Sequence, residues 1–123
     1  MDYAYRRFTE HTFSDTVEAV GRSVAAHGFD ILQFHDICGR LAAKGFPIRP
    51  LVILEITPAD EAQDARLELL MPCRINVYED GGRVVVAALR PSVFSAIFPE
   101  HELDALAAEV DRLVMAIVDA ATD

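Results

Sequence analysis

The stretch 73–90 constrains the fold more than any other part of the sequence. Cys73, Ile75 and Val77 alternate with more polar residues, as in a strand that buries only one face. The sequence Asp80-Gly81-Gly82 then favours a tight turn, and the apolar run that follows it predicts a returning strand. This hairpin indicates an antiparallel sheet with one buried face.

Helical spacing marks two longer segments. Phe13, Val17, Val20 and Val24 follow one another at intervals of 4, 3 and 4, which predicts a helix with cap oxygens from Thr12 and Ser14 and an end at Gly28. A second helix is expected to begin at Pro99, with the acids of 100–111 on a solvated face. Its apolar stripe is Leu103, Leu106, Ala107, Val110, Leu113, Val114 and Ile117.

The remaining segments complete one domain over residues 1–123. Further strands are expected over residues 2–11, 29–37 and 51–56. Short helical insertions are expected at Asp36 to Gly45, from Pro58 to about Leu70, and at Pro91 to Phe98. The order β-α-β-β-β-β-α predicts an α+β fold, a mainly antiparallel sheet of about five strands packed on two main helices.

The charge balance bears on partners and location. Eleven basic and twenty acidic residues give a formal charge of 11 − 20 = −9, which opposes binding to nucleic acid or to an anionic bilayer. No apolar run approaches the roughly 20 residues of a membrane-spanning helix, and the first residues carry charge where a secretory signal is apolar. We therefore expect a cytoplasmic protein with reduced thiols.

Five short segments carry a family resemblance. They are Gly28-Phe29, Asp36-Ile37, Arg49-Pro50, Met71-Pro72-Cys73 and Val77-Tyr78-Glu79-Asp80-Gly81. Together they resemble the domain-of-unknown-function family numbered 302, of bacteria and archaea, over nearly the whole chain. The resemblance implies a TATA-binding-protein-like α+β fold and a homodimer, and it brings no established activity.

One departure from the family concerns cysteine. Family members often carry a second cysteine after the third strand, where this chain has Glu55-Ile56-Thr57-Pro58. If the family's cysteines act as a pair, this protein has lost that chemistry or has replaced the second thiol with Cys38.

Four residues form the candidate ligand site: Arg49, Glu55, Cys73 and Tyr78. A thiol at the start of a strand could be a nucleophile, a redox group or a soft-metal ligand if Arg49 or Arg74 lowered its pKa. The alternative is that Cys73 is a small inward-facing thiol of the core. Together the four residues suggest a mostly apolar pocket with a few polar groups.

Glu55 interrupts an apolar strand, and a carboxylate there needs solvent, a cation or a ligand. Arg49 and Arg90 are candidate partners. Because Glu55 alternates with Leu54 and Ile56, a place on the wet face of the sheet or at a dimer interface is preferred.

These observations favour a non-catalytic, homodimeric module that binds a small ligand or a partner. No nucleotide loop, nucleophile elbow or paired-carboxylate motif is present, and no cofactor is specified. A first alternative is thiol-dependent redox or enzyme activity centred on Cys73. A second is metal or haem binding through His35, Cys38 and Cys73, although His35 and Cys38 straddle a strand end, which disfavours chelation.

Overall fold

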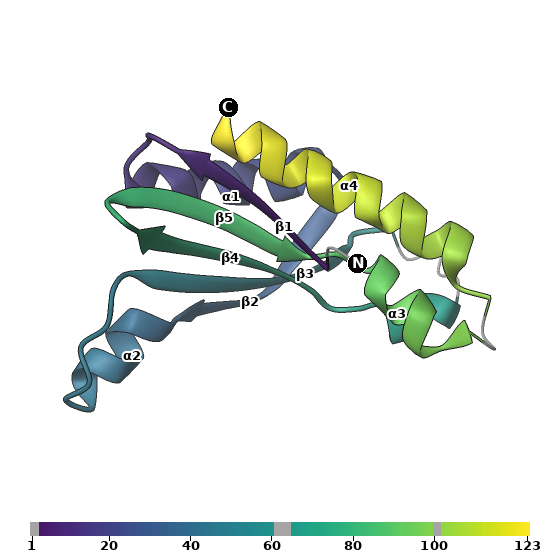
Figure 1. Ribbon diagram of the computed structural model, residues 1–123, viewed down its shortest axis with the longest axis horizontal. Helices are drawn as coiled ribbons and strands as arrows, with labels where there is room; N and C mark the ends of the chain where they lie inside the picture. The colour runs from purple at the N-terminus through teal and green to yellow at the C-terminus, as the bar shows by residue number, and fades with distance from the viewer. Residues whose placement is uncertain (1–2, 61–64, 100–101) are drawn as a thin grey trace.

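Five strands form one antiparallel sheet in the order β1-β5-β4-β3-β2 (Figure 1). The computed structural model describes residues 3–60, 65–99 and 102–123. The elements are β1 (Ala4–Thr9), α1 (Phe13–Ala26), β2 (Phe29–Asp36), α2 (Ile37–Ala43), β3 (Leu51–Pro58), a short 3-10 helix (Ala65–Leu69), β4 (Cys73–Asp80), β5 (Arg83–Leu89), α3 (Ser92–Ile97) and α4 (Asp104–Thr122). The predicted α+β class and the order of the main elements are confirmed.

The β4–β5 hairpin has the two-residue turn that its sequence predicts. Asp80 and Arg83 face each other across the turn, and Gly81 and Gly82 have φ angles of +59° and +82°. Two successive positive φ angles are characteristic of a type I′ turn, and glycine adopts them without a Cβ clash. The turn therefore fixes the register of the two central strands.

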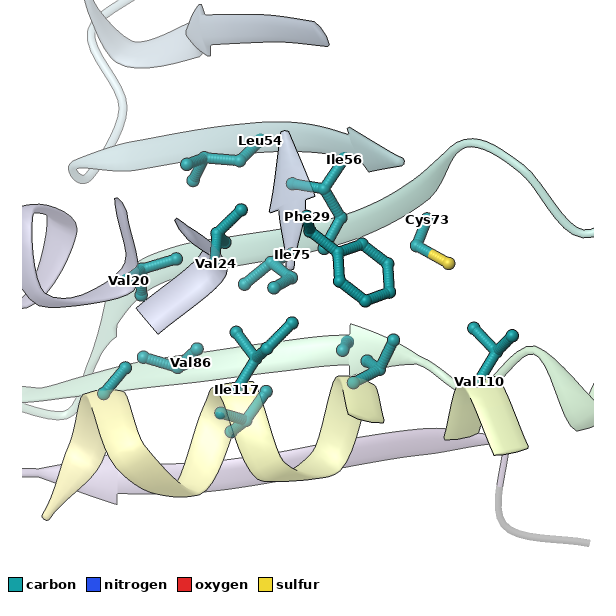
Figure 2. Packing of buried hydrophobic residues seen from close by; sticks show 14 of the residues in the cluster. Val20, Val24, Phe29, Leu54, Ile56, Cys73, Ile75, Val86, Val110 and Ile117 are labelled. Carbon is teal, nitrogen blue, oxygen red and sulfur yellow. The ribbon is translucent and has the colours of Figure 1, made fainter. Parts of the chain in front are cut away.

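Both long helices pack on the same face of the sheet (Figure 1). Val20 and Val24 from α1 meet Ile117 from α4 above Ile75 of the central strand, and all of them are at most 1% exposed (Figure 2). The hydroxyl of Ser23 donates to the carbonyl oxygen of Ile117 at 2.8 Å and joins the helices directly. The apolar stripes read from the sequence thus form one core.

Two predicted helix starts are wrong. Pro58 does not open a helix, because it is the last residue of β3 and pairs with Phe29 of β2. A proline is tolerated at a strand end, where the missing N–H costs little. The last helix begins at Asp104 rather than at Pro99. Residues 61–64 and 100–101 of the two predicted starts lie outside the described residues.

The short helix α2 projects from one end of the sheet, away from the face that α1 and α4 cover (Figure 1). Asp36 caps it, since its Oδ1 accepts from the backbone N–H of Gly39 at 2.9 Å. After α2, Phe46 is 65% exposed and Ile48 is 40% exposed. Of the helices in the described part of the chain, none combines the length and apolarity that spanning a membrane requires.

Candidate functional site

One face of the sheet lies opposite α1 and α4, and neither of these long helices covers it (Figure 1). We call it the open face, and it is formed by the side chains that alternate with the core residues of each strand. Its residues on the four strands β1, β5, β4 and β3 are Ala4, Arg6, Phe8, Arg83, Val85, Ala87, Leu89, Arg74, Asn76, Tyr78, Asp80, Leu51, Ile53, Glu55 and Thr57. His35 of β2 adjoins them beside Ile53.

An apolar row crosses the open face from strand to strand. In the register of the sheet Leu51 pairs with Tyr78, Tyr78 with Val85 and Val85 with Phe8. Val85 is only 1% exposed although it lies on the face opposite α1 and α4. The guanidinium of Arg83 lies 3.8 Å from the centroid of the Phe8 ring, and half of that ring remains exposed.

Beside this row lies a polar pair that the sequence did not predict. His35 Nε2 and Glu55 Oε2 are 3.0 Å apart, and both side chains are about a quarter exposed. Nδ1 of His35 and Oδ1 of Asn76 are buried, and neither has a hydrogen-bond partner among the described residues. Both residues flank Ile53 in the same row of the sheet. Most buried polar groups in proteins are hydrogen-bonded, so these two atoms are exceptions within the described residues.

Glu55 faces away from the core, as its alternation with Leu54 and Ile56 suggested. Its predicted cation partners are wrong, because Arg49 pairs with Asp80 at 3.6 Å and Arg90 pairs with Asp111 at 3.0 Å. The carboxylate meets His35 instead, since β2 lies antiparallel to β3 and brings that ring alongside.

Arg49 and Tyr78 do lie together. Both line a shallow pocket of about 300 Å³ at the end of the sheet from which α2 projects, with Pro50 and Leu51 between them. Arg49 is mostly exposed and its ion pair with Asp80 is long, so it adds little to stability.

Cys73 lies elsewhere, on the helix-covered face at the opposite end of β4. It pairs with Ile56 in the sheet and is 4% exposed, beside Ile56 and Phe29 in the core (Figure 2). It lies five positions from Tyr78 along β4, a span of about 17 Å. The four candidate residues therefore occupy separate places: Arg49 with Tyr78, Glu55 with His35, and Cys73 in the core.

Burial decides the state of the thiol. Loss of solvent raises the pKa of Cys73 to about 12, and the negative charge of Asp111 contributes in the same direction. Its Sγ lies 3.9 Å from the carbonyl oxygen of Leu70 and 3.6 Å from the sulfur of Met71. A thiol with such a pKa is protonated at neutral pH and is a poor nucleophile.

Labelling with a thiol reagent should distinguish the two cysteines. At about pH 8 the thiolate fraction of Cys73 is on the order of a thousandfold below that of an exposed, unperturbed thiol, so Cys73 should stay unlabelled in the folded protein. The variants Cys73→Ala and Cys38→Ala each keep a single thiol, so mass spectrometry of each variant gives the labelling rate of one cysteine. Labelling of Cys73 in the folded Cys38→Ala protein at the rate seen in urea would contradict this assignment.

The residues proposed for metal binding are not gathered. Cys38 is partly exposed and its Sγ contacts the carbonyl oxygen of Ile48 at 3.4 Å, whereas His35 is engaged with Glu55. Both cysteines are free thiols. Within residues 3–60, 65–99 and 102–123, no three His, Cys, Asp or Glu side chains lie close enough to hold a metal ion.

Asp111 is a residue whose role the sequence did not reveal. It was expected on a solvated helix face, but it is 4% exposed. Its Oδ2 accepts from Nε of Arg90 at 3.1 Å, and its Oδ1 accepts from the backbone N–H of Ser92 at 2.9 Å. The expectation failed because α3 folds back over this turn of α4, which the spacing within α4 does not indicate.

Comparison with known proteins gives a family and a fold. A model of the family described as "Domain of unknown function DUF302" matches residues 5–121. The crystal structure of an uncharacterized conserved DUF302 protein from Bacillus stearothermophilus is similar, with a TM-score of 0.87 and 22% sequence identity over 98% of this chain and 99% of that chain. No curated protein matches the sequence.

Proposed function

Because the chain belongs to the DUF302 family, whose description assigns no activity, we propose its function from its geometry: a non-catalytic interaction module that forms a homodimer through the open face. The observation that carries the proposal is the apolar row Leu51–Tyr78–Val85–Phe8 on the face that neither long helix covers. An uncovered apolar sheet face is typical of a protein interface.

A second copy of the chain suits this face for a geometric reason. The apolar row crosses β3, β4, β5 and β1, so a twofold axis parallel to the strands lays the row of one copy on the row of the other. Sheets that pack face to face in this way interdigitate their side chains about 10 Å apart. Apolar residues then meet apolar residues without any rearrangement of the strands.

Charge also favours contact at this face. The chain carries −9 in total, so two copies repel each other over most of their surfaces. On β1, β5, β4 and β3, however, the open face carries Glu55 and Asp80 against Arg6, Arg74 and Arg83. Two copies therefore repel each other less at the open face than the total charge of −9 implies. The same total charge opposes nucleic acid and anionic membranes as partners.

The state of Cys73 supports a module without catalysis. The thiol that a redox or thiol-enzyme activity would use is buried and protonated, and Asp111 adds negative charge near it. Two free cysteines in one chain also fit a reducing compartment, so we place the module in the cytoplasm.

Sedimentation tests the dimer directly. At about 10 µM protein the wild type should sediment with twice the monomer mass of 13.6 kDa. Ile53 lies beside the apolar row and pairs with Asn76. Ile53→Lys should therefore shift the species to the monomer, because the interface would have to bury an unpaired ammonium group.

The control is the same substitution at an exposed isoleucine outside the open face. Ile97 on α3 is 58% exposed, so Ile97→Lys should leave the sedimenting mass at the dimer value. A wild-type monomer at this concentration would overturn the homodimer. A dimer that survives Ile53→Lys unchanged would place the interface on another surface.

A further inference from the structure

A separate apolar cavity lies at the end of the sheet where β4 begins and β5 ends, between residues of the core and of the open face. It has a volume of about 220 Å³ and is lined by Leu70, Leu89, Phe94, two prolines, Cys73 and Arg74. The 3-10 helix and α3 flank it, and two segments of the chain, 70–74 and 89–94, build its walls. Its volume is below the range for drug-sized ligands, which restricts it to a small molecule.

The wall of this cavity is electrically neutral except at one residue. Cys73 is protonated at neutral pH, since burial raises its pKa to about 12. Leu70 and Phe94 add apolar surface. Such a lining favours the apolar body of a ligand and disfavours a charged group within the cavity.

Arg74 is the exception. Its side chain is exposed, and within the described residues no hydrogen bond or ion pair engages its guanidinium. Glu55, its neighbour across the sheet, is engaged with His35 instead. The nearby Arg90 is held by Asp111. Arg74 therefore offers unused N–H donors beside an apolar cavity, in a protein whose net charge is strongly negative.

We propose that this cavity binds a small apolar monocarboxylic acid, with the apolar body among Leu70, Leu89 and Phe94 and the carboxylate on Arg74. A guanidinium binds a carboxylate through two parallel N–H donors, which a lysine would not do. The proposal goes beyond the homodimer and does not depend on it, because about 13 Å of strand separates Arg74 from the apolar row at Tyr78.

Titration with benzoate and with benzamide tests the proposal. The two probes share a ring and nearly the same shape, but only benzoate carries a charge. Benzoate should shift the backbone amide resonances of Cys73, Arg74 and Phe94, and it should bind about tenfold more tightly than benzamide. In Arg74→Gln that preference should fall to about one.

Arg6→Gln is the matched control, because Arg6 is another exposed arginine of the open face that does not line the cavity. It should keep the wild-type preference for benzoate. Benzamide binding as well as benzoate, an unchanged preference in Arg74→Gln, or no shift at about 10 mM benzoate would each overturn the proposal. Without Arg74 the open face still carries Arg6 and Arg83 against Glu55 and Asp80, and the apolar row is unchanged. Sedimentation of Arg74→Gln should therefore still give the wild-type mass, which separates this result from the fate of the dimer.

Discussion

Asp111→Ala is expected to lower the free energy of unfolding by about 3 kcal/mol. The carboxylate is almost fully buried and accepts from Nε and Nη2 of Arg90 and from the backbone N–H of Ser92, all within 3.1 Å. Its removal takes the Asp111 carboxylate away from a guanidinium that is only one-third exposed. The N–H of Ser92 also loses its acceptor at the start of α3.

Denaturant unfolding followed by circular dichroism measures this loss, and the melting temperature should fall by about 10 °C. Glu109→Ala provides the control on the same helix. Glu109 is exposed and pairs with Arg112 one turn away, so its removal should cost at most about 0.5 kcal/mol. Equal losses of unfolding free energy in the two variants would show that the buried Asp111–Arg90 pair is worth no more than an exposed ion pair.

The role of Asp111 was beyond the reach of sequence patterns for a specific reason. Within α4 it follows Val110, and acids near a helix start normally face solvent. Its partners come from the end of β5 and the start of α3, which lie about twenty residues earlier. Spacing within one element predicts the face that packs against the sheet, but it carries no information on which loop folds over a given turn.

The arrangement of the main elements was predictable because local rules and tertiary packing agree. Thr12 caps α1 through its Oγ1, which accepts from the backbone N–H of Asp15 at 3.1 Å, and Gly28 ends the segment with a φ of +79°. Where local rules and tertiary packing disagreed, tertiary packing decided the structure. Pro58 has the composition of a helix start, but pairing with Phe29 extends β3 through it.

The candidate site was only partly predictable for a related reason. Alternation correctly placed Glu55 opposite the core face, and the same rule placed Cys73 facing inward. Arg49 and Tyr78 meet because the residue after Pro50 opens β3 beside the end of β4. Alternation within a strand cannot indicate that β2 supplies His35 to Glu55, because strand order is set by the packing of the whole sheet.

Ile75→Ala is expected to cost about 4 kcal/mol of stability, a larger loss than that from Asp111→Ala. Ile75 is fully buried at the middle of the central strand, beneath Val24 and Ile117 from the two long helices (Figure 2). Its loss removes apolar area from the core and leaves a cavity that the helices cannot close, because Ser23 and Ile117 hold them together.

The matched substitution, Ile97→Ala on α3, removes the same atoms from a side chain that is 58% exposed and should cost less than about 0.5 kcal/mol. Urea unfolding of both variants gives the difference in their free energies of unfolding directly. The protein concentration is held equal, because a dimer would add its own stabilisation. If the two losses agree within about 1 kcal/mol, the sheet and the helices do not share the single core described here. A difference near 4 kcal/mol would show that the face opposite the proposed interface holds the fold together, which leaves the open face available for binding.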